Sequence, residues 1–196
     1  THNNGTITTN SSDAFGNVTI GVQLSVLAIS TAQQSGGAVA LPVSAVAAVK
    51  DAATAPSITV STGGAPAKVA IPTQTPSAGT VAVIIREDGS SQVIRNSALT
   101  NDSIVAVLPD GATVKIVDNS KNFVDVPAGS PFENAVAFVS ARELFHNTAD
   151  TVFAPEAPMT NAMLITALAR LDGTETDSSA EAGENTSWYT KSMEWA

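Results

Sequence analysis

The sequence contains no cysteine, so neither a disulfide framework nor a thiolate metal site can stabilise the fold. Its only histidines are His2, in a polar terminus, and His146. The sequence therefore has few of the residues that a serine–histidine pair or a zinc site requires. Asp102 and Asp110 lie in expected loops, but neither begins the D-x-D-x-D-G spacing that wraps a calcium ion. We therefore expect no enzyme activity, no cofactor and no metal site.

No apolar run is long enough to span a bilayer, because the longest, residues 38–49, has twelve residues and contains Pro42 and Ser44. Basic residues are also scarce: nine Lys and Arg stand against 18 Asp and Glu, and the net charge is -9. Nucleic-acid binding draws on clustered Lys and Arg, and anionic lipid repels an acidic protein. Neither nucleic acid nor a membrane is therefore an expected partner, and the acidity favours solubility on a crowded surface.

The charge is strongly segregated along the chain. Residues 1–85 contain only Asp13, Lys50, Asp51 and Lys68, which cancel, so the whole net charge lies in residues 86–196. The content of hydrophobic residues, 43%, is ample for a buried core. The sequence thus predicts two unlike parts in one chain.

Residues 17–118 are rich in Val, Ile, Thr and Ala, in short alternating runs separated by Gly, Pro, Asn and Asp. This pattern predicts an all-β domain, a sandwich or a barrel. Asp-Gly pairs at 88–89 and 110–111 predict tight hairpins. Residues 1–16 form a polar arm, frayed unless it adds an edge strand. The expected strands are 18–23, 26–30, 38–41, 57–61, 68–72, 80–86, 92–96, 104–108 and 113–117, and helical spacing after Pro42 predicts a short helix over 43–50.

Two amphipathic helices are expected after residue 122. Each has apolar residues at i, i+3, i+4 and i+7, so each should bury one stripe. Thr160 can cap the second helix and Gly173 can end it. The junction 118–122 is short, so we expect the two parts to touch. The predicted stripes are Phe132, Ala135, Val136 and Val139 in the first helix, and Leu164, Ala167, Leu168 and Leu171 in the second.

Residues 123–173 also contain four spaced elements in a fixed order: an F-x-D-V opening at Phe123, an aromatic before an Ala-Val pair, an F-x-P turn at 153–155 and a Pro-x-Thr helix start. This segment resembles one S-layer homology repeat. An acidic linker over 174–187 leads to 188–196, which resembles the start of a second repeat, cut short. Residues 80–120 resemble the connector placed before such repeats in surface proteins of gut anaerobes. We expect a signal segment upstream of Thr1.

The resemblance implies a small α-helical module, so the fold class expected for the whole chain is α+β, with the all-β domain first. It implies noncovalent anchoring of a secreted, extracellular protein on a Gram-positive cell wall or S-layer. The partner it implies is a cell-wall secondary polysaccharide, which carries a negatively charged ketal and sits in grooves between adjacent repeats. In that family, an arginine of the motif Thr-Arg-Ala-Glu binds the charged ketal. A guanidinium group suits this ligand because it can donate two hydrogen bonds to a carboxylate.

The matching residues here are Thr160, Asn161, Ala162 and Met163, without the arginine, and Glu143 and Asn147 replace glycines that are usual in the family. We expect this repeat to be mainly a scaffold, with strong binding supplied by further repeats. The candidate polymer-binding residues are Asp125, Phe132, Thr160, Asn161 and Trp188. Structural alternatives stay open: Asp125 bracing the helix start, and Phe132 and Trp188 as packing residues.

A second function, from another class, stays open as well. The β-rich part can be an adhesion module that binds glycans or proteins on the cell surface, with the repeat acting only as its tether. Sugars stack on aromatic faces, and Phe15 is the single aromatic before residue 119. The stacking form of this alternative is therefore disfavoured.

Overall fold

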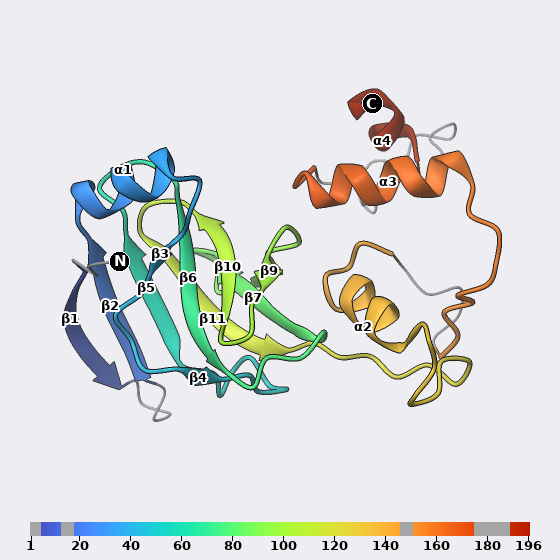
Figure 1. Cartoon of the computed structure of the whole chain (residues 1–196), viewed down its shortest axis with the longest axis horizontal. Coiled ribbons are helices and arrows are strands. Elements are labelled where there is room, and N and C mark those ends of the chain that lie inside the picture. The colour runs from blue at the N-terminus through green and yellow to red at the C-terminus, as the bar shows by residue number, and fades with distance from the viewer. Residues whose placement is uncertain (1–4, 13–17, 146–150, 175–188) are drawn as a thin grey trace.

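The computed structural model describes residues 5–12, 18–145, 151–174 and 189–196. A β-rich body occupies one end of the molecule and three helices the other (Figure 1). The α+β class expected from the sequence is confirmed. In the described ranges, no helix combines the length and the apolar character that crossing a membrane requires.

The body consists of two sheets. The first has six strands in the order β1 (Gly5–Ser12), β2 (Val18–Leu24), β5 (Ser57–Ser61), β11 (Ala112–Asp118), β7 (Thr80–Ile85) and β8 (Ser91–Val93). The second has the order β3 (Val39–Ala40), β6 (Ala67–Gln74), β10 (Ser103–Leu108) and β9 (Ala98–Leu99), and β4 (Val46–Ala47) also pairs with β6. The pairings are antiparallel except β2 with β5 and those of β3 and β4 with β6, which are parallel.

One hydrophobic core lies between the sheets. Successive side chains of a strand point to opposite faces, so alternate residues of each strand enter this core. Buried residues of both sheets share one cluster, which makes the body a sandwich, one of the two forms expected from the sequence. Examples are Ile58 and Val60 of β5, Val69 and Ile71 of β6, Ile104 and Leu108 of β10, and Val114 and Ile116 of β11.

Two elements predicted for the body have the wrong secondary structure. Residues 26–30 are not a strand but part of helix α1 (Val26–Gln34), which Ser25 caps by accepting a hydrogen bond from the backbone N–H of Ala28 at 3.2 Å. The predicted helix over 43–50 is instead irregular chain with the short strand β4. That segment finds its partners on β6, where the Gln74 side chain donates to the Ala45 carbonyl at 2.9 Å.

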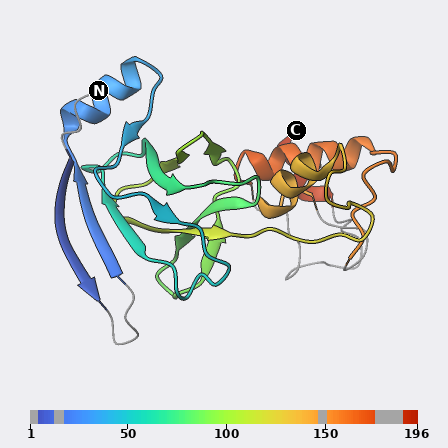
Figure 2. The same cartoon turned by 60° about the horizontal axis from the view of Figure 1, so that its bottom comes forward.

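The structure also shows the conformation of the polar arm and of the two Asp-Gly turns. Residues 5–12 of the arm form β1, an edge strand paired with β2 (Figure 2). Of the two states expected for the arm, frayed chain or edge strand, these residues adopt the edge strand. The Asp-Gly pair at 88–89 closes the hairpin of β7 and β8 as predicted, with Gly89 at a φ of 81°. The hairpin predicted at 110–111 is wrong, because β10 and β11 belong to different sheets and do not pair; this turn, with Gly111 at a φ of 74°, carries the chain from one sheet to the other. The Asp110 carboxylate accepts backbone N–H groups of Thr62, Gly63 and Gly64 at 2.6–3.2 Å, which lowers its pKa, the Thr62 contact first.

The helical part contains α2 (Glu133–Ala141), α3 (Asn161–Leu171) and α4 (Thr190–Trp195). Both helices expected after residue 122 form. Of the stripe predicted for α2, Val136 is buried and Val139 half-buried, but Phe132 and Ala135 are exposed, so that part of the prediction is wrong. The stripe predicted for α3 is wrong in three of its four residues, because Leu164, Leu168 and Leu171 are 41–46% exposed. Helix α3 instead buries Thr166, Ala167, Ala169 and Arg170, and Arg170 donates to the Leu144 carbonyl near the end of α2 at 3.2 Å.

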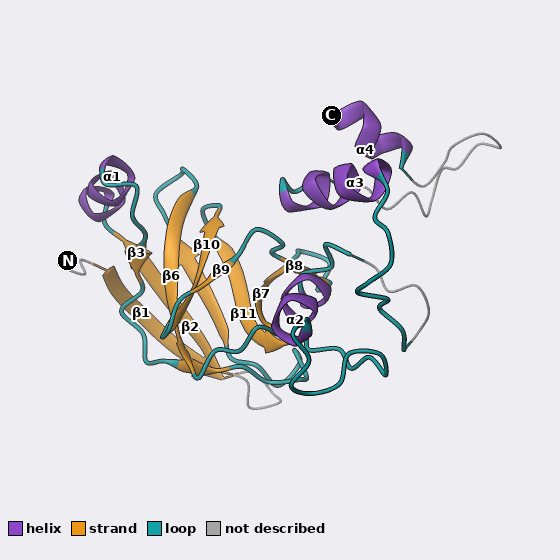
Figure 3. Ribbon diagram, turned by 45° about the vertical axis from the view of Figure 1, so that its right-hand side comes forward, coloured by secondary structure: helices purple, strands orange, loops and turns teal. Residues whose placement is uncertain are grey.

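The two parts are joined by a packed junction. Ala141, the last residue of α2, is fully buried among Val81, Val83 and Val117 of the six-stranded sheet. The Asn119 side chain donates to the Ala141 carbonyl at 2.6 Å. Figure 3 shows α2 beside β7 and β8. The two parts therefore touch, as the short junction predicts.

Candidate functional site

The F-x-D-V opening is bound to the F-x-P turn, thirty residues later in the chain. Both carboxylate oxygens of Asp125 accept backbone N–H groups, from Phe153 at 3.1 Å and Ala154 at 2.6 Å. The rings of Phe123 and Phe153 lie 5.3 Å apart, a distance at which aromatic pairs are favourable. Asp125 thus braces this turn and not the start of α2, where the Glu133 carboxylate accepts the Gly129 N–H at 2.7 Å.

The bracing contacts set the ionisation of Asp125. The hydrogen bond from the Phe153 N–H, and then that from Ala154, lower the pKa of this carboxyl below its ordinary value. A carboxylate with a lowered pKa stabilises the fold above its unfolded-state pKa of about 3.9, and this stability is lost as the pH falls through the folded-state pKa. The turn is therefore held by charge at neutral pH.

We expect Asp125→Asn to lower the unfolding temperature at pH 7, because the neutral amide has only one oxygen to accept a backbone N–H and its NH2 group would face the other N–H. The difference from the wild type should shrink as the pH falls from about 4, the unfolded-state pKa, through the lowered pKa of Asp125 in the folded protein. Thermal unfolding followed by circular dichroism across this range measures both effects. Glu156→Gln, on an exposed carboxylate of the same turn region, is the control. A pH-independent difference would contradict a role for the Asp125 charge.

An apolar groove of about 240 Å³ lies between α2 and the chain that leads into α3. The described residues that line it are all apolar, with Phe132 and Val139 of the α2 segment facing Phe153, Met159 and Met163. Such a groove suits an apolar side chain or the less polar face of a sugar. It offers no group for an acidic ketal.

The groove brings several of the candidate residues into one region. Phe132 lines it and is partly exposed, so it is not a buried core anchor. Asp125 holds Phe153 and Ala154, which also line it. Thr160 and Asn161 lie between the lining residues Met159 and Met163.

The chemistry of Thr160 and Asn161 follows from the start of α3. The Thr160 hydroxyl accepts the Met163 N–H at 3.2 Å, so the predicted helix cap is confirmed. Asn161 is exposed in the first turn of the helix. An amide and a capping hydroxyl can supply neutral hydrogen bonds there, but no positive side-chain charge.

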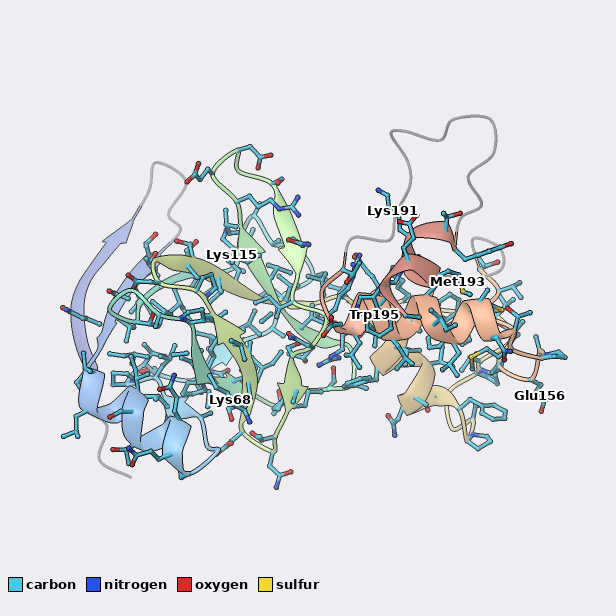
Figure 4. The ribbon with its side chains drawn as sticks, turned by 90° about the horizontal axis from the view of Figure 1, so that it is seen from above. Lys68, Lys115, Glu156, Lys191, Met193 and Trp195 are labelled. Atoms are coloured by element: carbon cyan, nitrogen blue, oxygen red, sulfur yellow. The ribbon has the colours of Figure 1, made fainter. Side chains whose placement is uncertain are left out.

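The candidate Trp188 and the turn residue His146 lie outside the described residues, as do residues 175–187 of the acidic linker. The neighbouring Trp195 is described. Its indole N–H donates to the Asp172 carboxylate at 3.0 Å, which ties α4 to the end of α3 (Figure 4).

Sequence reasoning missed a second pocket, of about 340 Å³, on the body near the junction. Three basic side chains line it: Lys50, Arg86 and Arg95. Lys50 comes from the chain before β5, Arg86 directly follows β7, and Arg95 lies just beyond the end of β8. The available signal was that both arginines surround one Asp-Gly turn, but nothing in the sequence indicated that Lys50 would join them.

In the part of the chain that the structure describes, no three His, Cys, Asp or Glu side chains gather as metal ligands would. Comparison of the chain with family models, with curated proteins and with solved structures found no match.

Proposed function

We propose that this chain holds a secreted bacterial surface protein noncovalently on a cell-wall secondary polysaccharide. The observation that carries the proposal is the brace between Asp125 and the turn at Phe153 and Ala154. It makes the opening and the turn of the repeat-like segment parts of one folded unit. Motif elements that contact one another are what a genuine repeat requires, whereas elements matched by chance have no reason to meet.

The exposed face of α3 supports the proposal that this repeat-like segment packs against neighbouring repeats. Leu164, Leu168 and Leu171 are exposed on this helix, although their spacing is that of a buried stripe. Each leucine side chain gains about 1.5–3 kcal/mol when it is fully removed from water. A neighbouring repeat packed on this face would recover part of that energy, so the proposal assigns strong polymer binding to a set of repeats.

The lack of positive charge among the described residues of the groove also favours strong polymer binding by further repeats and a scaffold role for this one. The groove is apolar, and Asn161 stands where the resembled family has its arginine. A neutral site binds a carboxylate-bearing sugar weakly, because charge-assisted hydrogen bonds are about twice as strong as neutral ones. In this proposal the unit acts mainly as a scaffold.

Co-sedimentation with isolated Gram-positive sacculi tests the proposal. We expect this chain to pellet with sacculi that carry their secondary polymer, more than with stripped sacculi, and a chain extended by two further repeats to be retained far more strongly. Retention that depends on neither the polymer nor the extension would favour the adhesion alternative. An affinity of this chain equal to that of the extended one would refute the scaffold role.

A pair of matched variants of the extended protein locates the contact between repeats. Leu168→Glu places a charge on the exposed face of α3 and should reduce retention. Val107→Glu introduces the same charge on the body, at a residue that is 51% exposed, and should leave retention nearly unchanged. Equal losses from both variants would show general charge repulsion and would remove the support drawn from α3.

A further inference from the structure

The pocket on the body gathers positive charge in an acidic protein. Lys50, Arg86 and Arg95 are three of the nine basic residues in the chain, which has a net charge of -9. The acidic side chains Asp118 and Glu143 also line the pocket, so its lining of three cations and two carboxylates has a net charge of +1. The pocket is therefore a positive site on a negative molecule.

The sheet sets the position of these groups. Val83 of β7 pairs with Val93 of β8, and both line the pocket, with Val117 of β11 also in the lining. Arg95 lies two residues beyond the end of β8, in the turn that follows this strand, and lines the pocket from there. An apolar floor with a charged and polar rim is the general build of a site for a small ligand.

Each of the two carboxylates contacts one cation of the pocket, Asp118 contacting Lys50 and Glu143 contacting Arg95. The Nζ of Lys50 lies 3.0 Å from Asp118, whose other oxygen accepts the Ser120 N–H at 3.0 Å. Burial disfavours the ionised form of Asp118, but the hydrogen bonds of Ser120 and Lys50 outweigh it and lower its pKa. Asp118 is thus held in place by its own neighbours.

The contact between Arg95 and Glu143 is looser. Arg95 is only 8% exposed, and its NH2 group lies 3.9 Å from the Glu143 carboxylate. Charge-assisted N–H···O⁻ bonds are about 2.7–2.9 Å long, so this ion pair is longer than a good one. A ligand oxyanion can therefore compete with Glu143 for the guanidinium.

We propose that this pocket binds a small polar molecule through an oxyanion, a carboxylate or a phosphate, placed between Arg95, Arg86 and Lys50. Guanidinium groups favour such anions because their planar N–H groups match two oxygens at once. Gln92, Ser91 and Asn119 on the rim supply hydrogen-bonding groups for the rest of the ligand. The volume of about 340 Å³ suits a ligand the size of one sugar. The inference does not depend on the anchoring function.

Titration of the whole chain, followed by amide chemical shifts in NMR, tests the site with three probes: inorganic phosphate, glucuronate and glucose. Glucuronate and glucose differ mainly in the carboxylate. We expect millimolar phosphate or glucuronate to shift the amides of Ser91, Gln92 and Asn119, and the same concentration of glucose not to. Phosphate alone binding would identify a free inorganic anion as the ligand, and glucuronate binding more tightly would identify an acidic sugar.

Variants decide whether the named cations form the site. Arg86 is exposed, so Arg86→Gln should fold normally and weaken binding about tenfold, the loss of one charge-assisted contact. Lys68→Gln removes the same charge on β6, outside the pocket, and should change affinity less than about twofold. Equal losses from both variants, equal shifts with glucose, or no shift with any probe would each overturn the proposal.

Discussion

Replacing Arg142 by alanine should lower the free energy of unfolding by about 3–5 kcal/mol. Arg142 is fully buried at the junction. Its guanidinium donates to three backbone carbonyls of the body, those of Ser97 at 2.9 Å, Ala78 at 3.2 Å and Thr80 at 3.3 Å. It also lies 3.8 Å above the centre of the Phe138 ring. Alanine would leave these carbonyls without their donors and open a cavity.

The charge of Arg142 is retained despite its burial. Burial lowers the pKa of the guanidinium to about 10, so the side chain is still protonated at neutral pH. The cost of burying this charge is offset by the three carbonyl dipoles and by the face of the aromatic ring. Arg142 therefore stabilises the contact between the two parts more than either part alone.

Urea unfolding with two probes measures this effect. Both tryptophans, Trp188 and Trp195, lie near the C-terminus, so their fluorescence reports the helical part, whereas far-ultraviolet circular dichroism is dominated by the body. We expect one coincident transition in the wild type and, in Arg142→Ala, a fluorescence transition at lower urea.

The control for this experiment is Arg86→Ala, which removes an exposed arginine and should change stability by less than about 0.5 kcal/mol. Similar losses from both variants, or coincident transitions in Arg142→Ala, would show that the junction does not depend on Arg142.

The body was largely predictable because its strands alternate. In residues 57–61 apolar and polar residues alternate at every step, and burial alternates there and over 67–74. Residues 104–108 are all apolar, but they are rich in Val and Ile, and their burial also alternates. Residues 26–30 were mistaken for a strand because Val, Leu and Ile suggest burial. The decisive signal was local, since Ser25 caps a helix whose Val26 and Leu27 are exposed.

The helical part was predictable in position but not in orientation. Thr160 caps α3, and Gly173 follows it at a φ of 92°, as expected. Which face the helix buries depends on its neighbours, and no periodicity contains that information. The contact between Arg170 and Leu144 and the packing of α4 turn the small residues inward and the leucines outward.

The candidate site shows the same limit. Asp125 was found from its motif, but its partners lie nearly thirty residues away, so its role could not be read locally. Arg142 gave no signal, because it binds carbonyl groups, which every residue carries. Lys50, Arg86 and Arg95 come from separate segments, and only the folded sheet places them together.

Two adjacent residues of β10 provide a direct test of the sandwich. Leu108 is fully buried in the core between the sheets, and Val107, its neighbour, is 51% exposed. We expect Leu108→Ala to lower the free energy of unfolding by about 2–5 kcal/mol, through lost burial and the cavity left behind. Val107→Ala should cost less than about 1 kcal/mol, mainly from lower strand propensity.

Both changes remove apolar atoms from the same strand, and the loss of strand propensity is the larger for β-branched Val107, so it works against the expected order. Their difference in urea-induced unfolding therefore reports burial between the sheets. Because Leu108 pairs with Ala67 of β6, a shift of the strand register by one residue would exchange the faces of Leu108 and Val107. A larger loss for Val107→Ala would thus show that β10 presents its opposite face to the core, and equal losses would show that the two sheets do not enclose it.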